Sequence, residues 1–269
     1  MTPNLIWRRT FLAAALSLLA TGCLTPPGGA MSAVTPVSDQ PRVGNVYLLR
    51  GFIGIFSTGI DDLGKKINGN GMRAVVYQDD QWSRLADTIA EKYRAHPDHE
   101  PIALVGHSYG ADDVVRIARK LDAANIPVDL LVTLDPVTPP SVPRNVKTCL
   151  NLYQSNGVMD NLPWLRGIPL SREEGSLSVV INANIRTERP DLWEAPLDHF
   201  NIEKKPLVHD EIVKHLLTVC IPRAEWTAGR PLLPPVAVVP TEAKTPAQTG
   251  TRSQADSGEN GVQVAAQNR

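Results

Sequence analysis

Short apolar runs alternate with amphipathic stretches along most of the chain, and this alternation limits its fold more than any other feature. Six runs rich in Val, Ile and Leu have the length of buried strands. They lie at Asn45–Arg50, Arg73–Tyr77, Pro101–Gly106, Val128–Asp135, Asn145–Gln154 and Leu177–Ile185. Apolar strands separated by helices are typical of βαβ units, so the pattern predicts an α/β fold. We expect a mostly parallel sheet of about six strands with helices on both faces.

The stretches between the strands carry apolar residues at helical spacing. Thr58 and Asp61 form a T-x-x-D capping signal for one helix, which should stop at the turn sequence "NGNG" of residues 68–71. Three more helices are indicated by Trp82/Leu85/Ile89/Tyr93, by Val114/Val115/Ala118/Leu121 and by Leu207/Val208/Ile212/Leu216/Leu217. In such sheets ligands bind beyond the carboxyl ends of the strands, so functional residues are expected in the loops that follow strands.

The sequence "LVGHSYGAD", from Leu104 to Asp112, joins the third strand to the next helix. Gly106 and Gly110 flank Ser108 at positions i−2 and i+2, which indicates a turn too tight for side chains there. Such a turn exposes the serine at its tip, while His107 should point away from it. A serine hydroxyl becomes a good nucleophile only when a base takes its proton and a carboxylate orients that base. We therefore predict Ser108 as the nucleophile and look for its partners.

The acid and the base are sought at the ends of later strands. Asp135, in "VTLDPV", ends the fourth strand, and Pro136 stops that strand just past the carboxylate. Asp160, beyond the following strand, is the alternative acid, but Asp135 is favoured because it lies nearer its strand end. His199, in "APLDHFNIE", follows the last strand and is the predicted base. Solvated helix positions explain His209 and His215, and His96 and His99 lie in a polar loop.

The order Ser–Asp–His, with "GHSYG", "LDPV" and "DHFNIE", resembles the α/β-hydrolase superfamily over roughly Val43 to Leu217. Within it, the chain is similar to small bacterial esterase/lipase-like or thioesterase-like members. The resemblance implies an acyl-enzyme mechanism with Ser108 as nucleophile, Asp135 as acid and His199 as base.

The resemblance also implies an oxyanion hole made of two backbone N–H groups. One belongs to Tyr109, after the serine, and the other comes from "RGFIG", where Phe52 is the candidate. Arg50 stands where His is common in this superfamily, so the second donor departs from the usual motif. The domain is also small, and no long cap is evident.

The expected substrate is a small-molecule acyl ester, because apolar residues cluster near the predicted mouth of the site. They are Phe52, Ile53, Phe56, Val137, Trp164, Leu165 and Ile168. A thioesterase or an acyltransferase with the same triad is one alternative, and a non-catalytic envelope lipoprotein is another. No Gly-rich phosphate loop, metal-spaced His pair or CxxC motif occurs, so no cofactor and no metal are expected. A formal net charge of −1 without a basic cluster argues against nucleic acid as a partner.

The first residues have the pattern of an export signal, over residues 1–22. Arg8 and Arg9 precede "FLAAALSLLA", an apolar run too short to span a bilayer. "RRTFL" resembles the twin-arginine export motif with Trp7 in place of the usual Ser or Thr, and both the Tat and the Sec routes stay open. Leu19–Cys23 resembles a bacterial lipobox, so we expect a lipid on Cys23; an ordinary signal peptide cut nearby is the alternative. In a host with two membranes, Leu24 after the cysteine favours the outer one, facing the periplasm.

Composition divides the rest of the chain into three parts. Residues 23–41 are rich in Pro, Gly, Ser and Thr and are predicted to be a flexible tether, the folded domain spans residues 42–223, and residues 224–269 form a disordered tail. With Cys23 lipidated, Cys149 and Cys220 remain. Export into an oxidising compartment allows them to form a disulfide, and two buried thiols are the alternative.

Overall fold

A parallel sheet forms the centre of the computed structural model, which describes residues 28–52, 57–96, 98–155, 162 and 167–226. Six strands pair in the order β2-β1-β3-β4-β5-β6. They are β1 (Asn45–Leu49), β2 (Arg73–Tyr77), β3 (Ile102–His107), β4 (Val128–Leu134), β5 (Val146–Tyr153) and β6 (Val179–Asn184). Each lies within two residues of its predicted range, and the predicted α/β fold is confirmed.

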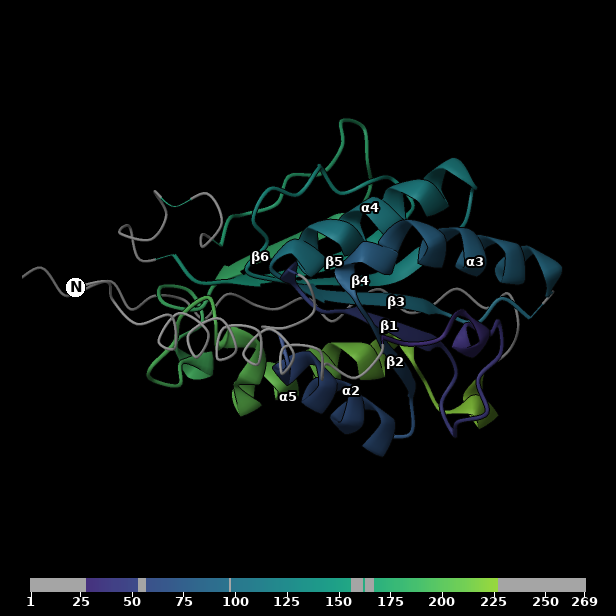
Figure 1. Ribbon diagram of the computed structural model, residues 1–269, viewed down its shortest axis with the longest axis horizontal. Coiled ribbons are helices and arrows are strands. Elements are labelled where there is room, and N and C mark those ends of the chain that lie inside the picture. The colour runs from purple at the N-terminus through teal and green to yellow at the C-terminus, as the bar shows by residue number, and fades with distance from the viewer. Residues whose placement is uncertain (1–27, 53–56, 97, 156–161, 163–166, 227–269) are drawn as a thin grey trace, which may run out of the picture. The chain divides into compact units, whose positions relative to one another are not determined.

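Helices cover both faces of this sheet (Figure 1). One face carries α2 (Gly59–Gly69) and α5 (Pro206–Val219), and the other carries α3 (Trp82–Ala95) and α4 (Tyr109–Ala123). Successive side chains of a strand point to opposite faces, and β1 shows this alternation. Val46 and Leu48 pack under α2 and α5, whereas Tyr47 and Leu49 pack under α3 and α4. Because both faces are covered, apolar runs without polar interruption are the natural sequence for these strands.

The predicted capping signal of α2 is not formed. Thr58 occupies the N-cap position with helical backbone angles and makes no side-chain cap hydrogen bond. Asp61 instead accepts a hydrogen bond from Arg50 Nε at 3.2 Å and pairs with the same guanidinium through its second oxygen. The helical angles of Thr58 differ from the extended ones of a capping residue, and the carboxylate of Asp61 is held by Arg50.

The described part of the predicted tether, residues 28–41, packs against the domain. Val34 is fully buried in the core under α3. The N–H of Gly29 donates to the carbonyl of Val76 at 2.6 Å, and the hydroxyl of Tyr47 donates to the carbonyl of Thr35 at 3.4 Å. This stretch therefore differs from the flexible segment that its composition predicts. The export signal and Cys23 lie outside the described residues, as do residues 227–269 of the predicted tail.

The two ends of the folded region are joined at the amino edge of the sheet. The N–H of Val43 donates to the carbonyl of Ile221 at 3.0 Å, and that of Arg223 donates to the carbonyl of Pro41 at 2.8 Å. Glu100, which is 3% exposed, receives the N–H of Gly44 at 2.7 Å and forms an ion pair with Arg223. Within the described ranges, no helix is both long and apolar enough to cross a bilayer.

The disulfide considered between Cys149 and Cys220 is absent, and both thiols are free and buried. Cys149 lies in β5 with its side chain in the core under α3 and α4, whereas Cys220 lies in the core under α2 and α5. The sheet separates the two sulfur atoms, so the pair cannot approach to bonding distance without unfolding. Burial raises the pKa of Cys220 to about 12 and that of Cys149 further, which keeps both thiols protonated.

Candidate active site

Ser108 lies on a strained turn between β3 and α4. Its backbone has φ 58 and ψ −125, a conformation that L-residues rarely adopt. A Cβ at Gly106 would lie 2.2 Å from the carbonyl oxygen of Gly110, and a Cβ at Gly110 would lie 2.3 Å from that of Arg50. Both glycines are therefore required for the backbone to pack this closely, and the turn presents the serine at the carboxyl edge of the sheet.

Three predicted residues meet at this edge. Nε2 of His199 lies 2.9 Å from Oγ of Ser108, and its Nδ1 lies 3.3 Å from Oδ2 of Asp135. The three residues are 4%, 7% and 0% exposed in the order His199, Ser108, Asp135. Nδ1 and Oδ2 have no other partner in the described part of the chain. The second separation is longer than a well-formed hydrogen bond, which is common in sites without bound substrate.

The surroundings of Asp135 orient its carboxylate. Oδ1 accepts the backbone N–H of Gln154 at 2.7 Å, which leaves Oδ2 to face His199. A Cβ at Gly167 would lie 2.2 Å from Oδ1, so a glycine is needed for that segment to pass. Burial raises the pKa of Asp135, while the imidazole of His199 and the N–H of Gln154 act in the opposite direction. An imidazolium formed at His199 would favour the ionised carboxylate further.

Asp112 fixes the loop that follows Asp135. Its carboxylate, at the start of α4, accepts the N–H groups of Val137 and Thr138 at 2.9 Å each and the hydroxyl of Thr138 at 3.1 Å. The side chain is fully buried. The sequence alone predicts only that this aspartate favours the positive end of the helix. Its partners are distant in sequence, and no local pattern points to them.

His107 points away from Ser108 and bridges two loops of the site. Its Nε2 lies 2.9 Å from the backbone oxygen of His199, and its Nδ1 lies 2.8 Å from Oγ of Ser57. A carbonyl only accepts, so Nε2 carries the proton. Burial, followed by the proximity of His199, lowers the pKa of His107 to about 3, so the ring is neutral and Nδ1 accepts.

The donors and acceptors of the other hydrogen bonds in this network are then determined. The Ser57 hydroxyl donates to Nδ1 of His107, and Ser57 Oγ accepts the N–H of Gly51 at 2.9 Å. The hydrogen-bond network thus runs from Gly51 through Ser57 and His107 to the carbonyl of His199. It links the loop after β1 to the backbone of the histidine that contacts Ser108.

The histidine loop is held by its own turn and by an arginine. The N–H of Asp198 donates to Oδ1 of Asn201 at 2.9 Å, and the N–H of Phe200 donates to Oδ1 of Asp198 at 2.8 Å. Arg186 donates from Nη2 to the carbonyl of Leu197 at 2.7 Å. His199 therefore has a fixed backbone on both sides, which limits the positions that its ring can reach.

Two backbone N–H groups remain open beside the serine. Within the described residues, neither the N–H of Tyr109 nor that of Phe52 has a hydrogen-bond acceptor. The rings of Phe52 and Tyr109 lie 5.7 Å apart, which places the two residues side by side. An unpaired donor at the first position of a helix also has the helix dipole behind it. Both groups can therefore receive an anionic oxygen.

The other predicted residues fall into three groups. Asp160, Ile53, Phe56, Trp164 and Leu165 lie outside the described residues. Val137 is 1% exposed and belongs to the core, and Ile168 is partly buried with its carbonyl bonded to Asn151. His209 and His215 are buried rather than solvated: His209 Nε2 donates to the carbonyl of Glu203 at 2.6 Å, and His215 Nε2 lies 3.3 Å from Glu211.

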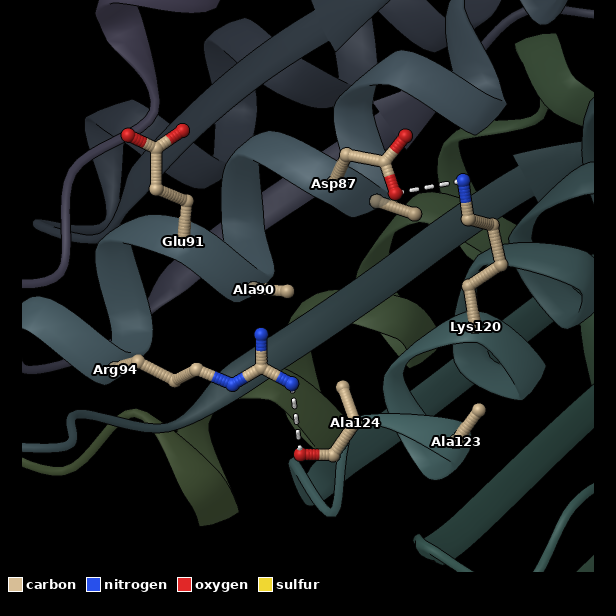
Figure 2. Close-up of a pocket in the computed structure, with 8 residues that line it drawn as sticks. Asp87, Ala90, Glu91, Arg94, Lys120, Ala123 and Ala124 are labelled. Atoms are coloured by element: carbon tan, nitrogen blue, oxygen red, sulfur yellow. Dashed lines mark hydrogen bonds and ion pairs between the residues drawn. The ribbon is translucent and has the colours of Figure 1, made fainter.

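A surface groove between α3 and α4 is separate from this constellation (Figure 2). Lys120 pairs with Asp87 across it at 2.7 Å, and Arg94 donates to the carbonyl of Ala124 at 3.3 Å. Lys120 follows Ser108 by more than three helical turns, which separates them by roughly 18 Å along α4. The groove lies at the amino edge of the sheet and contributes nothing to the site around Ser108.

Comparisons with known proteins give a family match and several structural likenesses. Residues 51–174 match the model of the thioesterase domain family. No curated protein matches the chain. Solved structures with a similar fold include a hydrolase of the α/β superfamily from Xanthomonas campestris pv. campestris, with 12% identity, coverage of 64% of this chain and 98% of that one, and a TM-score of 0.35.

Two further likenesses are of the same order. Lipase B of Aspergillus fumigatus has 12% identity and a TM-score of 0.43, with 66% of this chain and 53% of that chain covered. The thioesterase of the prodiginine pathway in Streptomyces coelicolor has 13% identity and a TM-score of 0.37, with 80% and 96% covered.

The parallel sheet, the strained serine turn after β3 and the thioesterase-domain match agree with one another. Residues 51–174 are thus similar to the thioesterase domain family, whose members hydrolyse esters or thioesters, and the described part of the chain has an α/β-hydrolase-like fold.

Proposed function

We propose that the protein cleaves acyl esters through an acyl-enzyme, with Ser108 as nucleophile, His199 as general base and Asp135 as the orienting acid. The observation that carries this proposal is the 2.9 Å contact between His199 Nε2 and Ser108 Oγ, on a ring whose other nitrogen faces a buried carboxylate. His199 takes the serine proton as Oγ attacks the acyl carbon. The resulting imidazolium then protonates the leaving alcohol or thiol, and water releases the acid by the same steps.

The backbone N–H groups of Tyr109 and Phe52 are the proposed oxyanion donors. They would stabilise the negative oxygen of each tetrahedral intermediate, a contribution of about 3–4 kcal/mol per donor in related chemistry. Gly51 precedes Phe52, and its own N–H is bound to Ser57. That bond holds the loop, and the N–H of Phe52 has no acceptor among the described residues, which supports Phe52 as the second donor.

A mutant series tests the assignment with p-nitrophenyl esters of several chain lengths. Ser108→Ala and His199→Ala should each lower kcat roughly a million-fold, and the double variant should lose little more, because the two groups act as a unit. Asp135→Asn should lower kcat about ten-thousand-fold. Asp160→Asn is the matched control and should stay within a few-fold of wild type. If Asp160→Asn lowered kcat severely and Asp135→Asn lowered it only mildly, the acid would be Asp160 in the later loop.

Thioester cleavage is a second candidate, favoured by the thioesterase-domain match over residues 51–174. The same triad serves both reactions, because only the leaving group differs. Measuring kcat/KM for an oxoester and a thioester of one acyl chain separates them. A thioester preference well beyond that of the uncatalysed reactions would identify a thioesterase, and added alcohol acceptors would reveal acyl transfer.

We also propose that the mature protein is a lipoprotein, attached through Cys23 to a membrane of the cell envelope. The lipobox-like sequence Leu19–Cys23 after a short apolar run supports this. Metabolic labelling with a fatty-acid analogue should mark the wild type and not Cys23→Ser. Equal labelling of both proteins would show that Cys23 is not the lipidated residue.

A further inference from the structure

The segment of residues 28–41 enters the domain at the carboxyl edge of the sheet. A Cβ on Gly28 would lie 2.9 Å from the backbone nitrogen of Gln78, directly after β2, and the N–H of Gly29 binds the carbonyl of Val76. The segment then follows β2 toward its amino end, where the N–H of Arg42 donates to the carbonyl of Gly71. Gly28, the first described residue, therefore lies at the edge that carries Ser108.

Only four residues, Leu24–Pro27, separate Cys23 from Gly28. A fully extended chain spans at most about 3.6 Å per residue, so Gly28 stays within roughly 18 Å of a lipidated Cys23. β1 alone lies between β2 and β3, the strand that ends at His107. Strands are spaced about 4.8 Å apart, so the end of β3 lies only about 10 Å across the edge from the end of β2.

Two exposed aromatic side chains flank the serine on this edge. Phe52, which is 54% exposed, contacts Tyr109, the residue after Ser108, and Phe200, which is 49% exposed, packs edge-on against His199. Among the described aromatic residues these two expose the largest share of their surface. We call Phe52 and Phe200 the aromatic rim. Aromatic rings exposed next to a site are suited to contact with another apolar phase.

Charge does not supply the attraction to a membrane. Asp79 and Asp80 lie next to Gln78, where the segment enters, and the net charge of the chain is −1. Basic clusters are what draws proteins to anionic lipids, and none is present here. Contact with a bilayer would therefore depend on the lipid anchor and on the aromatic rim, whose rings suit the boundary between headgroups and acyl chains.

We propose that the anchor on Cys23 and the aromatic rim together hold the carboxyl edge of the sheet against the bilayer. Ser108 then faces the membrane surface, and its substrates are esters or thioesters whose acyl chains lie in that surface. This inference rests on the proposed lipidation and on the proposed serine chemistry. The partner that the aromatic rim contacts is the lipid bilayer itself.

A lipid-quenching experiment tests the orientation. The full-length lipoprotein is purified from membranes and reconstituted into phosphatidylcholine vesicles, with a nitrobenzoxadiazole probe on Phe200→Cys or on Asp98→Cys. Asp98 is exposed and precedes β3, so it is a matched control on the amino edge. Cys149 and Cys220 are fully buried and stay unlabelled in the folded protein. Spin-labelled phospholipids should quench the probe at position 200 at least about fivefold more than the probe at position 98.

Three control measurements separate the possible failures. Wild type should float with the vesicles and Cys23→Ser should not; a wild type that stays behind refutes the anchor and the orientation with it. Equal quenching at both positions in a floating protein refutes the orientation alone. Hydrolysis of a soluble p-nitrophenyl butyrate by the wild-type preparation, set against Ser108→Ala, tests the serine chemistry independently. Wild type should also cleave a vesicle-embedded long-chain ester at least about tenfold faster than Cys23→Ser.

Discussion

At the scale of single residues, the geometry around Ser108 depends on the buried histidine beside it. His107 directly precedes Ser108, yet it holds the backbone of His199 and, through Ser57, the N–H of Gly51. The proposed base and the proposed oxyanion loop are thereby fixed to the turn that carries Ser108. A displacement of about 1 Å in such a constellation can cost a hundredfold in rate.

Replacing His107 should therefore lower kcat with little effect on KM. His107→Leu removes both bonds and should reduce kcat about ten- to a hundredfold. His107→Gln can still place an N–H near the carbonyl of His199 and should lose less. Steady-state kinetics with p-nitrophenyl butyrate, on variants shown by circular dichroism to be folded, measures the effect. A fully active His107→Leu variant would show that the bridge is only structural.

At the scale of elements, the strands are the part that sequence predicts best. The four inner strands are short apolar runs that are largely buried, whereas the edge strands β2 and β6 are only partly buried; in all six, the strand ends lie close to the ends of apolar composition. Sequence can predict that Ser108, Asp135 and His199 lie close together, because parallel strands all end at one edge. The cap predicted at Thr58 does not form because that residue has helical backbone angles, and the contacts of Asp112 and Gln154 have no local sequence signal because their partners lie far away in sequence.

The short helix η7 (Ile202–Lys204), between the histidine loop and α5, buries a carboxyl group without a hydrogen-bond partner. The Glu203 side chain is 0% exposed, neither oxygen has a hydrogen-bond partner in the described residues, and Lys204 Nζ is 3.5 Å away. Burial raises the pKa of Glu203 from 4.5 to about 7. The folded protein therefore binds more protons here than the unfolded chain between these two pH values, so ionisation weakens folding as pH rises.

Glu203→Gln should accordingly be more stable than wild type at pH 8, by on the order of 2–3 kcal/mol. The difference should shrink as pH falls through 7 and reach its minimum below 4.5, where the wild-type carboxyl becomes protonated in both the folded and the unfolded state. Urea denaturation at several pH values measures it, and Glu91→Gln, at an exposed position on α3, is the control that should change little. A pH-independent difference would show that Glu203 does not titrate in this range.

At the scale of the whole molecule, the folded unit begins earlier than composition indicates. Pro, Gly and Ser suggest a tether before residue 42, but Val34 is fully buried and Glu100 binds both Ser38 and Gly44 through their N–H groups. One apolar residue in a polar stretch gives no periodic signal, so sequence patterns could not reveal this packing. The docked segment also determines from which edge a lipid anchor would leave.

Val34→Ser should destabilise the protein by about 2 kcal/mol or more, because the substitution leaves a cavity and buries a hydroxyl group among apolar side chains. Val179→Ser is a matched control, since that valine is 45% exposed at the start of β6. Thermal unfolding followed by circular dichroism compares the two. Equal, small shifts would mean that residues 28–41 contribute no packing and that composition alone described them correctly.

The most direct test of the central claim is the reaction of the protein with a fluorophosphonate probe, which modifies an activated serine without requiring knowledge of the substrate. Mass spectrometry should find the adduct on Ser108 in wild type and no adduct in Ser108→Ala. In His199→Ala and Asp135→Asn, the modification should be slower by about a thousandfold or more, because the hydroxyl loses its base or the base loses its orientation. An adduct on another serine, or an unchanged rate in His199→Ala, would contradict the triad.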